Sequence, residues 1–263
     1  MKKMNKYKIT LLVLCVMMMT SAVFTGTLAY LTDQEKVINT FTVGQVQITL
    51  DETEVTPDGK PTTDPPTRVT KNEYHLVPGE KYTKDPTITL GAGSEKSYIR
   101  MIMTVYNRSA VDTIIANAKN GLNDYADLLE GWDETVWVYK GFSVNEPENA
   151  ISFEFRYKEA VAGEDTAKAL EPLFTHLSVP STLNGEELKA LYDGNFRIVV
   201  EGHAIQATGF SDVTEPGEEG QPDKVTKTAE DVAWEAFSNQ MAAEAAITQT
   251  TQTENTNDEI EIQ

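Results

Sequence analysis

The sequence YIRMIMTVY, from Tyr98 to Tyr106, is a run of nine residues in which Arg100 is the only charge. A short run rich in apolar and β-branched residues, bounded by polar turns, is typical of a buried strand. We expect it to form a central strand with one face fully buried. The segment FRIVVEGHAI, from Phe196 to Ile205, has the same character and predicts a second long strand.

Shorter segments on either side of these two runs also favour strands. Apolar and polar residues alternate with a period of two in several of them, so that every second side chain would face the core. Ser109 and Asp112 fit a capping box at the start of a short helix. The predicted strands are residues 37–43, 46–50, 87–90, 135–139, 151–157 and 173–179, and the predicted short helices are 109–118, 124–129 and 186–191. Many short strands with few helices between them predict a mainly β, antiparallel β-sandwich.

The N-terminus resembles an export signal. Four lysines lie within residues 1–8, residues 9–24 are almost wholly apolar, and small residues precede a polar stretch that begins at Thr32. These are the parts of a secretory signal peptide, here residues 1–29, with a signal helix and cleavage between Ala29 and Tyr30. The alternative is an uncleaved N-terminal anchor, although the apolar run is short for a membrane span.

The chain is strongly acidic, with 22 basic and 41 acidic residues. Four lysines and no acids lie within residues 1–29, so residues 30–263 carry 18 basic against 41 acidic residues, a net charge of about −23. Such a surface repels nucleic acid and anionic lipid. The single cysteine, Cys15, lies in the signal segment, so no disulfide can form within the mature chain.

The composition divides the rest of the chain into segments. Residues 30–210 form the predicted β domain, and the acidic, proline-rich stretch 51–72 within it is expected to be a solvated loop. Residues 211–227 are rich in Glu, Gly, Pro and Asp and predict a linker. Apolar residues then favour a C-terminal helix at 228–246, and the polar residues 247–263 predict a disordered tail.

No catalytic pattern is present in the sequence. The three histidines, His75, His176 and His203, are far apart, and no H-E-x-x-H or G-x-S-x-G motif occurs. We therefore assign no catalytic, cofactor-binding or metal-binding residue, expect no cofactor, and predict that the protein is not an enzyme. A zinc site built by the three histidines, and weak calcium binding by acidic clusters such as 51–58, remain alternatives.

Aromatic residues offer a possible sugar-binding platform. Trp132, Trp137 and Tyr139 lie close together in the sequence. Trp137 falls on a predicted strand, which favours a core position, whereas Trp132 follows Gly131 and is a candidate for exposure. Trp234 is expected to dock the C-terminal helix on the sandwich, or else to anchor a partner.

Several of these segments together resemble the TasA/camelysin family of exported proteins from Gram-positive bacteria. The similarity lies in GTLAYLTD at 26–33, NTFTVG at 39–44, LVPG at 76–79, TKDP at 83–86 and AIQATGF at 204–210, with a weaker likeness around WEAF at 234–237. The resemblance implies a jelly-roll sandwich, a signal segment cleaved by a SipW-type signal peptidase, and a place at the cell surface or in the extracellular biofilm matrix. The metalloprotease label attached to camelysin is the basis of the zinc alternative.

Members of that family also assemble into matrix fibres by adding an N-terminal strand of one subunit to the sheet of the next. The matching candidate donor here is residues 30–43, with Val37, Ile38, Phe41 and Val43 as its apolar positions. The resemblance therefore implies self-association, or association with related matrix proteins, without nucleic acid and with membrane contact only through an uncleaved signal segment. The alternatives are an ordinary edge strand at 30–43, and a surface adhesin or fibre accessory protein that does not polymerise.

Overall fold

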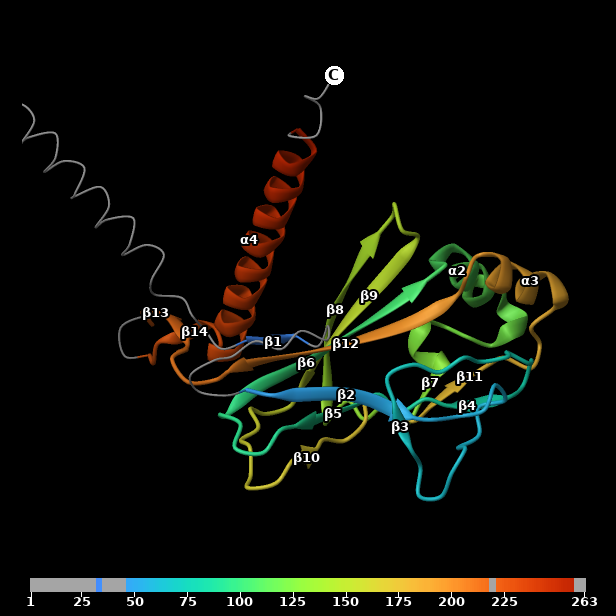
Figure 1. Ribbon diagram of the computed structural model, residues 1–263, viewed down its shortest axis with the longest axis horizontal. Helices are drawn as coiled ribbons and strands as arrows, with labels where there is room; N and C mark the ends of the chain where they lie inside the picture. The colour runs from blue at the N-terminus through green and yellow to red at the C-terminus, as the bar shows by residue number, and fades with distance from the viewer. Residues whose placement is uncertain (1–31, 35–45, 218–220, 258–263) are drawn as a thin grey trace, which may run out of the picture.

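The computed structural model describes residues 32–34, 46–217 and 221–257. All its strand pairs are antiparallel, and the helices between strands are short, so the mainly β prediction is confirmed. The strands form a five-stranded sheet, a four-stranded sheet, a three-stranded sheet and a separate two-stranded hairpin (Figure 1).

The five-stranded sheet contains both long strands that the sequence predicts. Its order is β1 (Thr32–Gln34), β12 (Arg197–Gln206), β6 (Ser97–Tyr106), β9 (Ala150–Tyr157) and β8 (Trp137–Asn145). β6 lies in the middle and pairs with β12 from Ser97–Gln206 to Tyr106–Arg197 without a register shift. Every second side chain of β6 is at most 2% exposed, which confirms the fully buried face: Ile99, Met101, Met103 and Val105.

The four-stranded sheet packs against the β6–β12 part of the first. It consists of β10 (Lys168–Ala169), β5 (Thr87–Leu90), β2 (Ile48–Thr53) and β3 (Arg68–Val69). Ile88 and Leu90 are completely buried, in one core cluster with the β6 residues. Gly202 of β12 lies so close that an added Cβ would be 3.0 Å from the Cδ1 atom of Ile88. Side chains from the two facing sheets therefore build the core.

The three-stranded sheet and the short helices close one end of this core. The sheet contains β4 (Lys81–Thr83), β11 (His176–Ser178) and β7 (Leu129–Glu130), and the helices are α2 (Arg108–Ala116), η1 (Ala118–Asn120), η2 (Tyr125–Leu128) and α3 (Gly185–Asp193). The capping-box prediction for α2 is wrong, because the residue before the helix is Asn107 and its side chain makes no cap bond. Instead, Asn149 from the β8–β9 turn accepts from the Arg108 and Ser109 N–H groups.

The prediction that residues 51–72 are all solvated loop is wrong at both ends of that range. β2 continues through Thr53, and β3 pairs with it at Arg68 and Val69. Glu52 and Thr53 are buried despite their polarity. Burial is possible because their polar groups are paired: Lys84 Nζ donates to Glu52 Oε2 at 2.6 Å, and the Thr53 N–H donates to Asp85 Oδ1 at 2.6 Å.

The C-terminal part also differs from the expected linker and tail. β13 (Val213–Glu215) and β14 (Lys224–Lys227) form an exposed hairpin where the composition predicts a linker. α4 (Ala229–Asn257) extends beyond residue 246 into the predicted disordered tail. A polar sequence can continue a helix because the helical backbone hydrogen bonds are satisfied within the segment itself.

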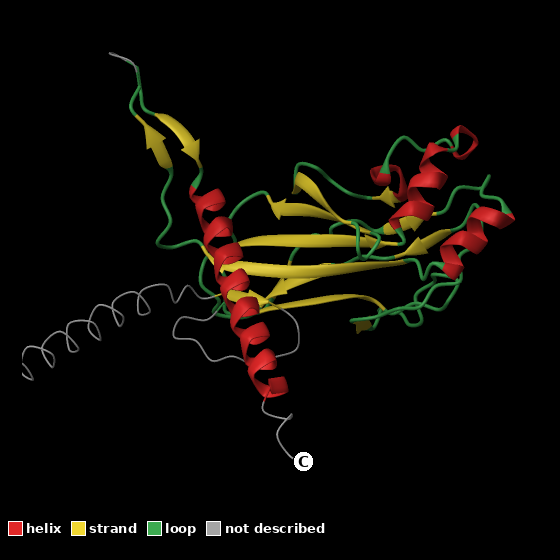
Figure 2. Cartoon of the chain, turned by 90° about the horizontal axis from the view of Figure 1, so that it is seen from above, coloured by secondary structure: helices red, strands yellow, loops and turns green. Residues whose placement is uncertain are grey.

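α4 docks on the outer face of the five-stranded sheet, crossing its strands near one end (Figure 2). Ala233, Trp234 and Phe237 are each at most 2% exposed and pack on Ile205. The Cζ atom of Arg100, on β6, lies 4.4 Å from the ring centroid of Trp234. The prediction that Trp234 docks this helix is therefore confirmed.

Substitution of Gly59 tests the packing of the loop between β2 and β3. Gly59 has φ +76°, and an added Cβ would lie 2.7 Å from the Cα of Tyr82. We expect Gly59→Ala to lower the free energy of unfolding by about 2 kcal/mol, from backbone strain together with overpacking. Gly93→Ala is the matched control, because Gly93 has φ +69° with nothing within 4 Å of the added Cβ. Its expected cost is about 1 kcal/mol, and equal losses in urea unfolding would contradict the packing argument.

Candidate functional site

The five-stranded sheet has two edges, and these are the candidate functional surfaces. β1 forms one edge and β8 forms the other. Within the described residues, each of these strands has one sheet neighbour: β12 for β1, and β9 for β8. An edge strand presents N–H and C=O groups to which another strand can bind.

The described part of the β1 edge is Thr32–Gln34. Within the described residues, β1 pairs with β12 at Thr32–Ile205, Asp33–Ala204 and Gln34–His203. In this single chain, these residues form an edge strand of their own sheet, as the alternative to a donor strand predicts. The donor positions Val37, Ile38, Phe41 and Val43, and the cleavage pair Ala29–Tyr30, lie outside the described residues.

The β8 edge carries exposed apolar side chains. The described residues include nine exposed large apolar side chains, and four of them lie on β8: Val138, Tyr139, Phe142 and Val144. Phe142 is the most exposed of the four, at 64%. Apolar side chains gathered on an edge strand are unusual for an isolated soluble protein, because they favour association.

Aromatic rings continue this surface inward from the edge. The ring of Phe153, on β9, lies 6.4 Å from that of Phe142 and 6.5 Å from that of Tyr139. The ring of Tyr125 also packs against Phe153, with the two ring centroids 5.1 Å apart. We call Tyr125, Tyr139, Phe142, Val144 and Phe153 the β8 patch. It is continuous with the core, because Phe153 pairs with Met103 of β6.

A hydrogen bond fixes one side of the β8 patch. The hydroxyl of Tyr125 donates to Asp112 Oδ1 at 2.6 Å. Burial of the ring, and then the hydrogen bond and negative charge of Asp112, raise the pKa of Tyr125. The phenol therefore remains neutral and keeps its donor role throughout the physiological pH range.

The same strand has features that limit uncontrolled pairing. The register of β8 and β9 shifts between Tyr139 and Gly141, which leaves Lys140 as an extra residue. A bulge and a lysine on an edge strand both hinder accidental strand addition. The β8 edge thus combines an apolar surface with a bulge and a lysine that restrict which strands can pair with it.

The three aromatic residues of the sugar-binding hypothesis lie close together but do not form an exposed platform. Trp137 is completely buried, and its Nε1 donates to the backbone oxygen of Glu171 at 2.9 Å, so the predicted core position is confirmed. Trp132 is half-buried, and its Nε1 donates to the backbone oxygen of Trp137. Only Tyr139 of the three presents a surface, and it does so as part of the β8 patch.

The three histidines lie in different surroundings. His75 is exposed in a loop, His176 is half-buried on β11, and His203 is buried on β12 beneath α4. Among the residues that the structure describes, no group of three or more His, Cys, Asp or Glu side chains is arranged to hold a metal ion. The zinc alternative therefore gains no support from these positions.

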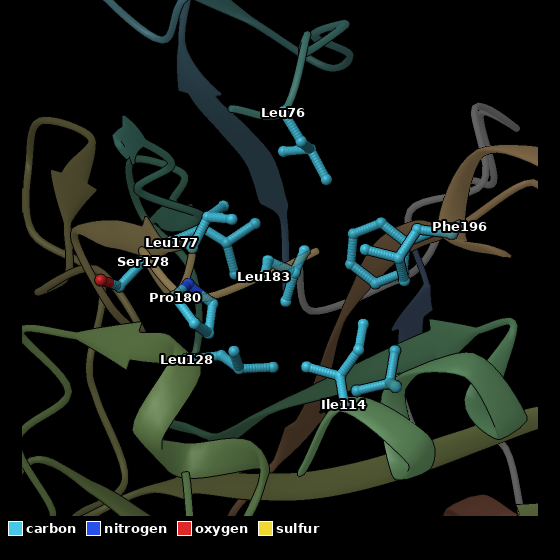
Figure 3. A pocket seen from close by; sticks show the side chains of 11 residues that line it. Leu76, Ile114, Leu128, Leu177, Ser178, Pro180, Leu183 and Phe196 are labelled. Carbon is cyan, nitrogen blue, oxygen red and sulfur yellow. The ribbon is translucent and has the colours of Figure 1, made fainter. Parts of the chain in front are cut away.

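A small apolar cavity lies between α2, α3 and the β11 segment (Figure 3). Its volume is about 30 Å³, whereas ligand pockets usually enclose about 300–1,000 Å³. Its lining is almost wholly apolar and includes Leu76, Ile114, Leu183 and Phe196. It is a half-open apolar hollow and does not have the size of a ligand site.

The part of the chain that the structure describes contains no helix long and apolar enough to cross a membrane. No protein-family model, curated protein or solved structure matches this chain. The two edges of the five-stranded sheet, together with the sequence, are therefore the features that bear on function.

Proposed function

We propose that this chain is a secreted structural protein of the extracellular or biofilm matrix, with a jelly-roll-like domain, that assembles by strand addition between copies. The observation that carries the proposal is the pair of edges on one sheet: an N-terminal strand at one edge and the β8 patch at the other. The resemblance to TasA/camelysin proteins agrees with this assignment.

The chain is long enough for such an exchange. Residues 30–43 reach about 46 Å when fully extended, and the nine residues of β8 span about 30 Å. A donor from one copy is therefore long enough to span β8 in the next copy. Backbone hydrogen bonds supply affinity in this mode, and alternate side chains supply specificity. Val37, Phe41 and Val43 fit the β8 patch because they are apolar and share one face of the predicted strand.

The position of the two edges determines the geometry of the assembly. β1, the described part of the donor segment, and the acceptor strand β8 lie at opposite edges of the sheet. Each copy would therefore donate a strand from one surface and accept a strand at a different one. A contact between two different surfaces continues from copy to copy unless its rotation closes a ring. A filament is therefore the expected product.

Export fits the same proposal. Cleavage between Ala29 and Tyr30 by a SipW-type signal peptidase frees the N-terminus of the donor only after the chain has left the cytoplasm. Assembly is thereby restricted to the cell surface or matrix, with further copies or related matrix proteins as partners. The acidic mature chain keeps single copies soluble until they meet.

Electron microscopy of the purified secreted chain tests the proposal. The sample is residues 30–263, with its N-terminus first established by sequencing, and the comparison is the same chain without residues 30–43. We expect fibres from the first and monomers from the second. A monomeric sample in both cases would reject assembly, and binding of that monomer to glycans or preformed fibres would instead favour the adhesin or accessory alternative.

A further inference from the structure

A buried carboxylate bridges an amine and an amide beside β2. Glu52 Oε2 accepts a hydrogen bond from Lys84 Nζ at 2.6 Å, and Glu52 Oε1 accepts one from Asn72 Nδ2 at 3.0 Å. Glu52 lies on β2, Asn72 lies between β3 and β4, and Lys84 lies between β4 and β5. Three separate segments therefore place their functional groups around one carboxylate.

Water has little access to this cluster. Glu52 and Lys84 are each less than 10% exposed, and the ring centroid of Tyr74 lies 5.9 Å from Lys84 Nζ. Burial and then the negative charge of Glu52 raise the pKa of Tyr74. In such a low-dielectric site, proton transfer between the ammonium and the carboxylate gives a neutral pair without the cost of separating charges.

The orientation of the Asn72 amide is fixed by its partners. Its Oδ1 accepts from the Val55 N–H at 3.0 Å, while its Nδ2 donates to the Thr53 carbonyl at 2.8 Å as well as to Glu52. A carbonyl oxygen held by a backbone N–H is polarised, and a negative charge that develops on it is stabilised. The nitrogen that would leave faces the carboxylate that can protonate it.

We propose that Lys84 and Asn72 form an intramolecular isopeptide bond, with Glu52 as the proton carrier. Glu52 takes a proton from the Lys84 ammonium, and the neutral amine attacks Cγ of Asn72, with the Val55 N–H stabilising the oxyanion. A second proton passes from the attacking nitrogen through Glu52 to Nδ2. The bond between Cγ and Nδ2 then breaks, and the released ammonia takes up the remaining proton as ammonium.

This step balances without a co-reactant. One C–N bond forms and one breaks, nothing is oxidised or reduced, and the carboxylate of Glu52 is regenerated. Glu52 holds both reacting groups, and attack requires the amine nitrogen to come within about 3–3.5 Å of the amide carbon. The resulting bond ties Asn72, beside β3, to Lys84, beside β5. It would give a domain without disulfides a covalent link of another kind.

Mass spectrometry of the purified full chain tests the proposal. We expect a mass lower than the calculated value by that of one ammonia molecule, about 17 Da. A proteolytic digest should contain one branched peptide that joins Asn72 to Lys84. Glu52→Gln and Lys84→Arg should each restore the calculated mass and abolish the branched peptide. Lys81→Arg is the matched control, because Lys81 forms an exposed ion pair with Glu130 and should leave the bond intact.

The wild-type chain decides the question even if a variant fails to fold. The calculated mass, with Asn72 and Lys84 recovered only in separate linear peptides after prolonged incubation, would overturn the proposal and leave a buried ion pair. A folded Glu52→Gln variant that still contains the branched peptide would overturn the role of Glu52. Because the readout is a covalent mass, failure here is distinct from failure to form fibres.

Discussion

The Phe142→Lys variant should remain folded and monomeric, and fibre formation should be lost. Phe142 is 64% exposed at the centre of the β8 patch, so its replacement costs the folded monomer little, within about 0.5 kcal/mol. In the assembled state, however, the same position would be covered by the donor strand, where an unpaired ammonium is strongly unfavourable. Electron microscopy and sedimentation of the secreted chain measure the loss.

Tyr192→Lys provides the control for this variant. Tyr192 is 87% exposed on α3, away from the β8 strand. Its replacement by lysine introduces the same charge in place of an exposed aromatic ring. Fibres should form from it as from the wild type. If Phe142→Lys assembles at the wild-type rate, β8 is not the acceptor edge, and strand addition would have to occur elsewhere on the sheet.

Acidification should destabilise the domain through His203. Its Nδ1 accepts from Arg100 Nε at 3.2 Å, and its ring lies 5.0 Å from that of Phe237. Its Nε2 is buried and has no hydrogen-bond partner among the residues that the structure describes. Burial, and then the positive charge of Arg100, lower the pKa of His203 from 6.5 to about 4. Protonation would place a second donor against Arg100, beneath Trp234 and Phe237 of α4.

The direction of the pH effect follows from proton binding. Between pH 6.5 and about 4, the unfolded chain binds a proton at His203 that the folded chain does not, so the free energy of unfolding falls as the pH falls through this window. The shift corresponds to about 3 kcal/mol at most. The carboxylate nearby on α4, Asp231, has a pKa below its usual 3.8 because of hydrogen bonds from Arg156 and Thr228, so it titrates below the window.

Urea unfolding between pH 7 and pH 4 checks this expectation. His203→Asn keeps an acceptor for Arg100 but cannot be protonated, so its stability should change much less across the window than that of the wild type. His75→Asn is the control, because His75 is exposed, and it should keep the wild-type pH dependence. A wild-type curve that is flat between pH 6.5 and 4 would contradict the buried, neutral state of His203.

The core strands could be predicted from sequence because their pattern is local. The apolar run at residues 98–106 and its partner at 196–205 both form long strands, and Trp137 is buried as its strand position indicates. Alternation places a side chain on one face or the other whatever its partner strand is. The docking of Trp234 was predictable for a similar reason, since a large aromatic residue in a short amphipathic segment needs an apolar surface.

Sites that depend on distant segments could not be predicted in this way. Residues 51–53 look like the start of an acidic loop, yet Glu52 is buried because Lys84 and Asn72 reach it from other segments. The N-terminus of α2 is capped by Asn149, forty residues away, rather than by its own Ser109. A single stretch of sequence does not indicate which distant group will neutralise its charge or accept its hydrogen bond.

The sequence by itself determined the mainly β class, the long central strands, the acidic character of the chain and the export-like N-terminus. Only the tertiary structure decided that β8 is an edge, that its aromatic side chains join the core of the sheet, and that an amine, a carboxylate and an amide meet beside β2. The physical reason is that side-chain periodicity arises within a strand, whereas strand order and the pairing of buried charges arise from contacts between segments that the chain brings together only on folding.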